Sequence, residues 1–91
     1  MGSVWTWVEA ARVISIRPCR LLGLVVTPSG DTASFTIYDG EGSSDPVILT
    51  IKLPTKDSTP FNFPGGLQTD RGLYIGTLTA ITGVLVHWEV D

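Results

Sequence analysis

The side chains that could carry out chemistry are few in this 91-residue chain. There is one histidine, His87, and one cysteine, Cys19, and the two lie far apart in the sequence. A nucleophilic cysteine needs a base beside it, and strand alternation places His87 on an outward face. We therefore expect Cys19 to fill apolar space and His87 to lie at a surface or an interface. The chain is predicted not to be an enzyme.

Acidic side chains are concentrated at predicted turns and strand ends. The densest group lies in residues 39–45, which have some likeness to a calcium-binding loop. This loop lacks the twelve-residue ligand spacing and the terminal bidentate glutamate of such sites. Paired carboxylates can also hydrolyse glycosides, but nothing distinguishes these from ordinary turn formers. Phosphate-binding, dinucleotide-binding and zinc-binding spacings are absent as well, so we predict no metal and no cofactor.

Charge and composition narrow the function classes further. Six Lys and Arg against nine Asp and Glu give a net charge of −3. Binding to a phosphate backbone needs several converging cations, so nucleic acid is not expected as a partner. No run approaches the roughly 20 apolar residues of a membrane-spanning helix, and we expect neither a membrane partner nor a secretory signal. A single cysteine cannot form an intramolecular disulfide, which suits assembly in a reducing compartment.

The apolar content exceeds what a domain of this length hides in one core. Hydrophobic residues make up 43% of the chain and charged residues only 16%. A chain this short buries only about 60–65% of the surface that it exposes when unfolded. We therefore expect the surplus apolar surface to lie at an interface.

Hydrophobic alternation predicts strands along almost the whole chain. Apolar residues recur at every second position in 33–38, 47–53 and 84–90, as in strands with one buried face. Residues 21–26 are apolar on both faces, which predicts a central strand, or a strand with one face in the core and the other against a neighbour. Turn signals recur roughly every 8–12 residues. The sequence thus predicts an all-β fold with about eight antiparallel strands in a two-sheet sandwich, of jelly-roll or immunoglobulin-like topology.

Finer predictions concern individual turns and faces. Residues 27–31 carry Pro, Ser and Gly, and are predicted to close a hairpin. Residues 64–66, Pro-Gly-Gly, are predicted to form a tight turn. Alternation places Val47 inward and Ile48 outward on their strand, and it places Trp88 in the core.

The N-terminal residues 1–11 are predicted to form an extended arm or an edge strand beside a single sandwich domain of residues 12–91. Trp5 and Trp7 point to the same side of an extended segment. In water, such a segment would associate with other apolar surfaces. Such an arm packs on another subunit or on a shell, or it folds back as an edge strand over its own core. A third interpretation is a platform on which sugar rings stack.

Several motifs in residues 17–90 follow a recognisable order. Ile37-Tyr38-Asp39-Gly40 is followed by a loop and a strand, and the pairs Gly66-Leu67 and Gly72-Leu73 stand before and after a short turn. This order resembles that of small β-sandwich structural proteins of tailed bacteriophages. The resemblance implies a virion component without catalytic residues, such as a head decoration (cement) protein, a neck or tail accessory protein, or a fibre adaptor. The segment before residue 17 extends beyond the family's pattern.

The resemblance and the surplus apolar surface together predict a protein of the virion, assembled in the cytoplasm of a bacterial host, that acts by binding. Its expected partners are copies of itself and other virion proteins such as the major capsid protein. By analogy with decoration proteins at three-fold positions, a trimer is favoured. The predicted contact residues are Trp5, Trp7 and Val8 for the N-terminal contact, and Ile48, Tyr74, Leu85 and His87 for subunit packing.

The alternative function is that of a carbohydrate-binding module associated with a neck, tail or fibre. In that interpretation Trp5, Trp7 and Tyr74 stack on a sugar. Loss of glycan binding in Trp5→Ala would distinguish it from the assembly protein.

Overall fold

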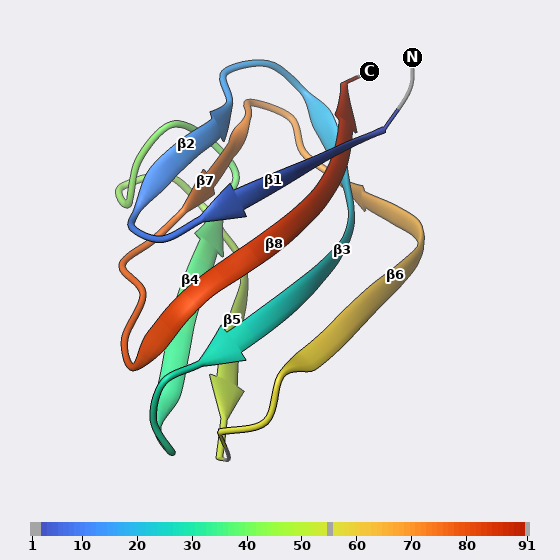
Figure 1. The fold of residues 1–91 in the computed structure, drawn as a ribbon. Coiled ribbons are helices and arrows are strands. Elements are labelled where there is room, and N and C mark those ends of the chain that lie inside the picture. The colour runs from blue at the N-terminus through green and yellow to red at the C-terminus, as the bar shows by residue number, and fades with distance from the viewer. Residues whose placement is uncertain (1–2, 55, 91) are drawn as a thin grey trace.

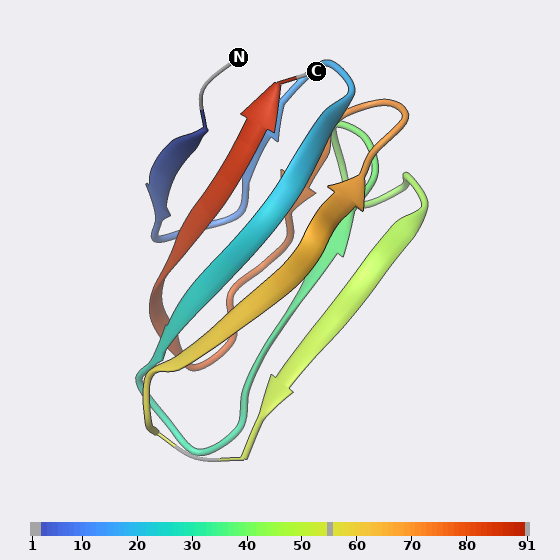
Figure 2. The same ribbon diagram turned by 90° about the vertical axis from the view of Figure 1, so that its right-hand side faces the viewer.

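The computed structural model describes residues 3–54 and 56–90, which form eight strands in two four-stranded antiparallel sheets (Figures 1 and 2). This arrangement confirms the predicted all-β sandwich. No helix that could cross a membrane lies within these residues. The strands are β1 (Val4–Val8), β2 (Arg12–Ser15), β3 (Cys19–Pro28), β4 (Ala33–Tyr38), β5 (Val47–Leu53), β6 (Thr59–Gln68), β7 (Leu73–Ile75) and β8 (Ile81–Val90).

The strand order identifies the topology. Sheet A has the order β1-β8-β3-β6, and sheet B has the order β2-β7-β4-β5. The first strand pairs with the last, the second with the seventh, the third with the sixth, and the fourth with the fifth. This is the pairing of a long antiparallel ribbon that has rolled up on itself, which is a jelly roll. The immunoglobulin-like alternative is therefore excluded.

The N-terminal segment is the edge strand of sheet A. β1 pairs with β8 over its full length, from Val4 opposite Trp88 to Val8 opposite Val84. Figure 1 shows it lying alongside β8 at the border of the sheet. Between the two interpretations of residues 4–8, a free arm and an edge strand, the structure has the edge strand.

The prediction that residues 27–31 close a hairpin is wrong. β3 pairs with β6 and β8, whereas β4 pairs with β5 and β7, so this turn carries the chain from sheet A to sheet B. The N–H of Ser29 donates to the carbonyl of Ala80 at 2.8 Å, which holds the turn against the β7–β8 connection. Only β4 and β5 are consecutive strands within one sheet, because a rolled ribbon places successive strands in opposite layers.

The prediction of a tight turn between strands at residues 64–66 is wrong. These residues lie within β6. Leu21 pairs with Leu67 and Gly23 pairs with Asn62, so the β6 residues between these pairs bulge out of the ladder. Gly65 and Gly66 have φ values of 80° and 78°, a conformation that glycine adopts without steric cost. β6 tolerates its prolines because it is an edge strand.

The core fills the space between the two sheets. β3, predicted to be central, pairs with β8 on one side and with β6 on the other. Its inward residues belong to one core cluster with those of β4, β7 and β8. Trp88 packs against this core, as predicted, and its Nε1 donates to Thr6 Oγ1 at 3.0 Å. The buried hydrophobic residues are Val8, Cys19, Leu21, Leu24, Val26, Ala33, Phe35, Ile37, Ile51, Leu53, Leu73, Ile75, Val84 and Val86.

The predicted faces of Val47 and Ile48 are wrong. Val47 is 58% exposed, and Ile48 packs against the core. The cause is a register shift: Tyr38 pairs with Val47, but the preceding Ile37 pairs with Leu49, which leaves Ile48 as the extra residue of a bulge. One extra residue reverses the alternation on one side of the bulge.

The start of β3 is fixed by Thr69. The N–H of Cys19 donates to Thr69 Oγ1 at 3.0 Å, and this hydroxyl donates to the carbonyl of Cys19 at 3.2 Å. Both residues are buried. Cys19 also fills apolar space in the core, as predicted.

We predict that Thr69→Val lowers the free energy of unfolding by about 2 kcal/mol, because it removes a buried hydroxyl on which backbone groups of Cys19 depend. Thr69→Ser, which retains the hydroxyl, should cost less. Urea denaturation measures both. Equal stability of Thr69→Val and the unmodified protein would contradict this account.

Candidate functional site

The outer face of sheet A carries the surplus apolar surface. Val84 and Val86 of β8 are fully buried, so alternation turns Leu85 and His87 outward. Val8 of β1 is likewise fully buried, and the neighbouring Trp7 faces outward with 44% of its surface exposed. This face has no covering layer within the described residues.

An apolar row crosses all four strands of this face. Trp7 pairs with Leu85, Leu85 pairs with Val25, and Val25 pairs with Pro60. We call these four residues the apolar row. Because cross-strand partners share a face, the four side chains lie side by side. Val25 and Leu85 are half-buried, and Trp7 and Pro60 are exposed.

Each of the two tryptophans is held by a residue of β8. Trp5 stacks on its cross-strand partner His87, with ring centroids 4.0 Å apart and an interplanar angle of 5°. The Trp7 indole lies over Gly83, where a Cβ atom would collide with the ring. Trp5 nevertheless remains 55% exposed. The rings are thus held in place by the sheet while one face of each stays available to a partner.

Polar side chains border the apolar row. Next to the apolar row, Trp5 pairs with His87, His87 pairs with Gly23, and Gly23 pairs with the polar Asn62. Farther along β3 and β8, Arg20 and Glu89 form an ion pair with Nη1 and Oε1 3.4 Å apart. Protein–protein interfaces combine an apolar centre with polar residues at the border, and Asn62, Arg20 and Glu89 provide such a border on one side of the apolar row.

The structure brings together four of the seven predicted contact residues. Trp5, Trp7, Leu85 and His87 share the outer face of sheet A. The other three lie elsewhere: Val8 is in the core, Ile48 packs against the core, and Tyr74 is on the outer face of sheet B. Val8 therefore offers no side chain to a partner, and the three aromatic residues proposed as one sugar platform lie on opposite sides of the sandwich.

Sequence reasoning missed Pro60 as a member of this face. The turn-forming residue types of residues 54–60 predict a loop there, but Pro60 is the second residue of β6. The sequence does indicate that Val25 lies on this face, because residues 21–26 are apolar on both faces of their strand.

The acidic residues of the loop 39–45 hold two loops of the protein together, and we call this set of contacts the clasp. The carboxylate of Asp39 accepts hydrogen bonds from the backbone N–H groups of Asp70 and Arg71, the latter at 2.8 Å. Asp45 accepts from the N–H groups of Glu41 and Gly42 at 2.7 and 3.2 Å. The Arg71 guanidinium lies 3.3 Å from Asp45 and joins the two loops. The carboxylates thus hold the β4–β5 and β6–β7 loops together.

These contacts lower the pKa of Asp45 below its ordinary value. The largest cause is the hydrogen bond from the Glu41 N–H; partial burial opposes it, and the Gly42 N–H and the Arg71 charge add to the lowering. A lowered folded-state pKa means that the ionised carboxylate favours the fold at pH above 3.8, its ordinary value. That contribution is lost as the pH falls through the folded-state pKa.

We therefore predict that Asp45→Asn is less stable than the unmodified protein at pH 7 and that the difference shrinks as the pH falls below 3.8 and through the folded-state pKa. Urea denaturation of both proteins at a series of pH values measures this. A difference that stays constant or grows toward low pH would contradict the assignment.

Cys19 and His87, the two side chains considered as a catalytic pair, lie apart in the structure. Cys19 is buried between the sheets, whereas His87 faces outward, so they do not form a nucleophile–base pair. Within residues 3–54 and 56–90, no three or more His, Cys, Asp or Glu side chains are grouped to hold a metal ion. Comparisons with protein-family models, curated proteins and solved structures found no match for the chain.

Proposed function

We propose that this chain is a structural protein of a tailed-bacteriophage particle, a head decoration (cement) protein that binds the assembled shell. The outer face of sheet A is its binding surface. The observation that carries the proposal is the apolar row Trp7–Leu85–Val25–Pro60, which crosses the whole sheet with Trp7 44% exposed. The resemblance of residues 17–90 to small phage β-sandwich proteins supports the choice of partner.

The exposed apolar side chains of sheet A, Trp5 and Trp7 above all, are costly to keep in water. Burying apolar area is favourable by roughly 25 cal/mol per Å², and tryptophan is enriched among residues that dominate binding energies. Trp5 is already ordered by stacking on His87, so docking it costs little further side-chain entropy. The surface is thus preorganised for a partner with a flat apolar patch.

Cement action follows from preferential binding. A protein that binds the assembled shell but not the separated subunits shifts the equilibrium toward the shell. The jelly roll contributes a stiff platform, because β1 is held by β8 along its full length. The tryptophans therefore act from a rigid sheet, and not from a flexible arm.

The test is co-sedimentation of the purified protein with particles of the phage that encodes it. Leu85→Glu should bind about 100-fold more weakly, because an unpaired charge buried at an interface costs about 2–5 kcal/mol. Val47→Glu is the matched control, since Val47 is an exposed apolar residue of sheet B, and it should bind normally. Circular dichroism verifies that both variants fold. Equal binding of the two variants would contradict the proposal, as would a chain that binds no particle.

Deletion of residues 1–11 is not a suitable test, because it removes Val8 from the core and β1 from the sheet. The mass of the protein in solution and its copy number on particles give separate information. A decoration protein is expected to bind in many copies over the shell, either as a monomer or as a trimer of three 9.8-kDa chains. A stable trimer that binds only at one vertex would instead assign the protein to the neck or tail.

A further inference from the structure

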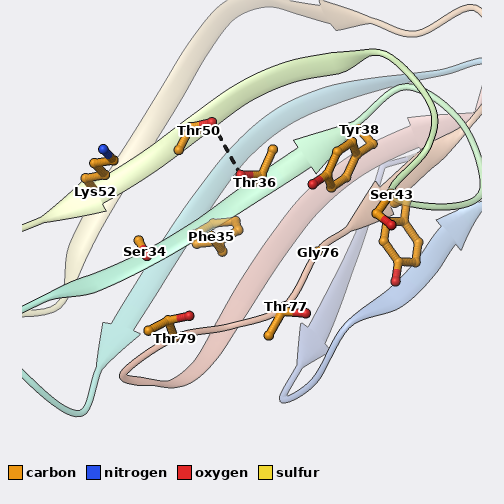
Figure 3. A pocket seen from close by; sticks show the side chains of 11 residues that line it. Ser34, Phe35, Thr36, Tyr38, Ser43, Thr50, Lys52, Gly76, Thr77 and Thr79 are labelled. Atoms are coloured by element: carbon orange, nitrogen blue, oxygen red, sulfur yellow. Dashed lines mark hydrogen bonds between the residues drawn. The ribbon is translucent and has the colours of Figure 1, made fainter.

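A hollow of about 290 Å³ lies on the outer face of sheet B, on the side of the sandwich opposite the apolar row (Figure 3). This volume is near the lower end of small-molecule sites, which span roughly 300–1,000 Å³. Strands β4, β5 and β7, the β4–β5 loop and the segment after β7 form it. The residues that line it are Ser34, Phe35, Thr36, Tyr38, Ser43, Thr50, Lys52, Tyr74, Gly76, Thr77 and Thr79.

Two tyrosine rings form one end of the hollow. Tyr38 and Tyr74 are cross-strand partners, with ring centroids 5.9 Å apart and an angle of 50° between the rings. Gly76 makes room for Tyr38, because a Cβ atom there would come within 2.9 Å of Tyr38 Cε1. The N–H of Gly76 donates to the Thr36 carbonyl at 2.8 Å and fixes this part of the floor. The Tyr38 ring thus packs closely against the backbone at Gly76.

Hydroxyl groups cover most of the remaining lining. Thr36 Oγ1 and Thr50 Oγ1 lie 3.3 Å apart and share a hydrogen bond, drawn in Figure 3. Within the described part of the chain, the hydroxyls of Ser34, Tyr38 and Tyr74 have no protein hydrogen-bond partner. Hydroxyls can both donate and accept. The hollow therefore presents several unused donor and acceptor positions beside two aromatic rings.

The hollow has one charge. Lys52 lies at the end away from Tyr38, as Figure 3 shows, and pairs across β4–β5 with Ser34. No carboxylate is among the lining residues, although the whole chain carries a net charge of −3. A local positive charge in an acidic protein selects for a ligand with a negative group.

We propose that this hollow binds an acidic sugar unit of a glycan. A pyranose ring has an apolar C–H face that suits the ring of Tyr38 or Tyr74, and hydroxyls that match those of Ser34, Thr36 and Thr50. Its carboxylate pairs with Lys52. An apolar ligand would leave the hydroxyls unpaired, which is costly, and a phosphate-rich ligand would find only one cation. The site is independent of the proposed shell contact, and both faces can be occupied at once.

The experiment is a glycan array of neutral and uronic-acid-containing oligosaccharides, followed by NMR titration of the unmodified protein with the best-bound member. Tyr74→Ala and Tyr38→Ala should each weaken binding about tenfold, as expected for the loss of one aromatic contact. Tyr74→Phe retains the ring and should lose less. Lys52→Ala should abolish the preference for uronic-acid-containing members over their neutral counterparts.

Trp5→Ala is the matched control on the opposite face and should bind the glycan unchanged. Binding that disappears in Trp5→Ala but survives in both tyrosine variants would overturn the proposal and favour the sugar platform on sheet A. An array without any bound member would also overturn it, and so would equal binding of neutral and acidic members. None of these outcomes bears on particle binding by sheet A, which Leu85→Glu tests separately.

Discussion

Val8→Asp is expected to unfold the protein, whereas Trp7→Asp is expected to leave it folded. Val8 is fully buried in the core, and Trp7, the adjacent residue, is 44% exposed on the outer face of sheet A. A carboxylate at position 8 would have neither water nor a charged partner, and burying such a group costs several kcal/mol. A chain of this length has a total stability of about 5–14 kcal/mol, so the variant loses much of it.

Far-ultraviolet circular dichroism and urea denaturation of the two variants measure this difference. Trp7→Asp loses the contact of the indole with Gly83, and a cost of about 1 kcal/mol is expected. If the two variants were equally stable, β1 would not contribute to the core, and the edge-strand assignment would be contradicted.

Asp39→Ala is expected to destabilise the protein by about 2 kcal/mol. The Asp39 carboxylate accepts from the N–H groups of Asp70, Arg71 and Gly72, at 2.8 to 3.4 Å. A hydrogen bond to a charged group is worth about 1.5–3 kcal/mol, and water compensates part of the loss because this loop is exposed. Asp39→Asn retains one acceptor oxygen and should cost about half as much.

Thermal and chemical denaturation of the three proteins give the order of stability. A second readout is amide hydrogen exchange, which should accelerate at Asp70 and Arg71 before it changes in the core. An Asp39→Ala variant as stable as the unmodified protein would show that the clasp between the loops contributes nothing to the fold.

Alternation predicted the strands well because each strand buries one face, and a period of two records that burial directly. It predicted the buried positions of β4 and the central place of β3 for the same reason. Alternation also places Val8 on the side of the strand opposite Trp5 and Trp7. The prediction that Val8 contacts a partner together with these tryptophans therefore conflicts with the alternation. The structure resolves this conflict in favour of burial.

The remaining features depend on which strands are neighbours, and a local pattern does not contain that information. The turn after β3 joins different sheets because its strands have partners from distant parts of the chain. The bulge at Ile48 reverses the predicted faces, and it is visible only once β5 is aligned with β4. The hollow beside Tyr38 and Tyr74 exists because β7 lies next to β4.

The two outer faces of the sandwich therefore have different chemistry. The face of sheet A is apolar and carries exposed tryptophans, and the face of sheet B is rich in hydroxyl groups around a pair of tyrosines. A protein attached to a shell by sheet A would present sheet B to the surroundings. The proposed glycan site would then be accessible on the bound protein.

The measurement that tests the shell contact most directly is hydroxyl-radical footprinting of the protein, free and bound to purified particles. Each face carries two aromatic reporters: Trp5 and Trp7 on sheet A, and Tyr38 and Tyr74 on sheet B. The account predicts that binding protects both tryptophans from oxidation and leaves the tyrosines as reactive as in the free protein. Protection of the tyrosines with unchanged tryptophans would contradict it.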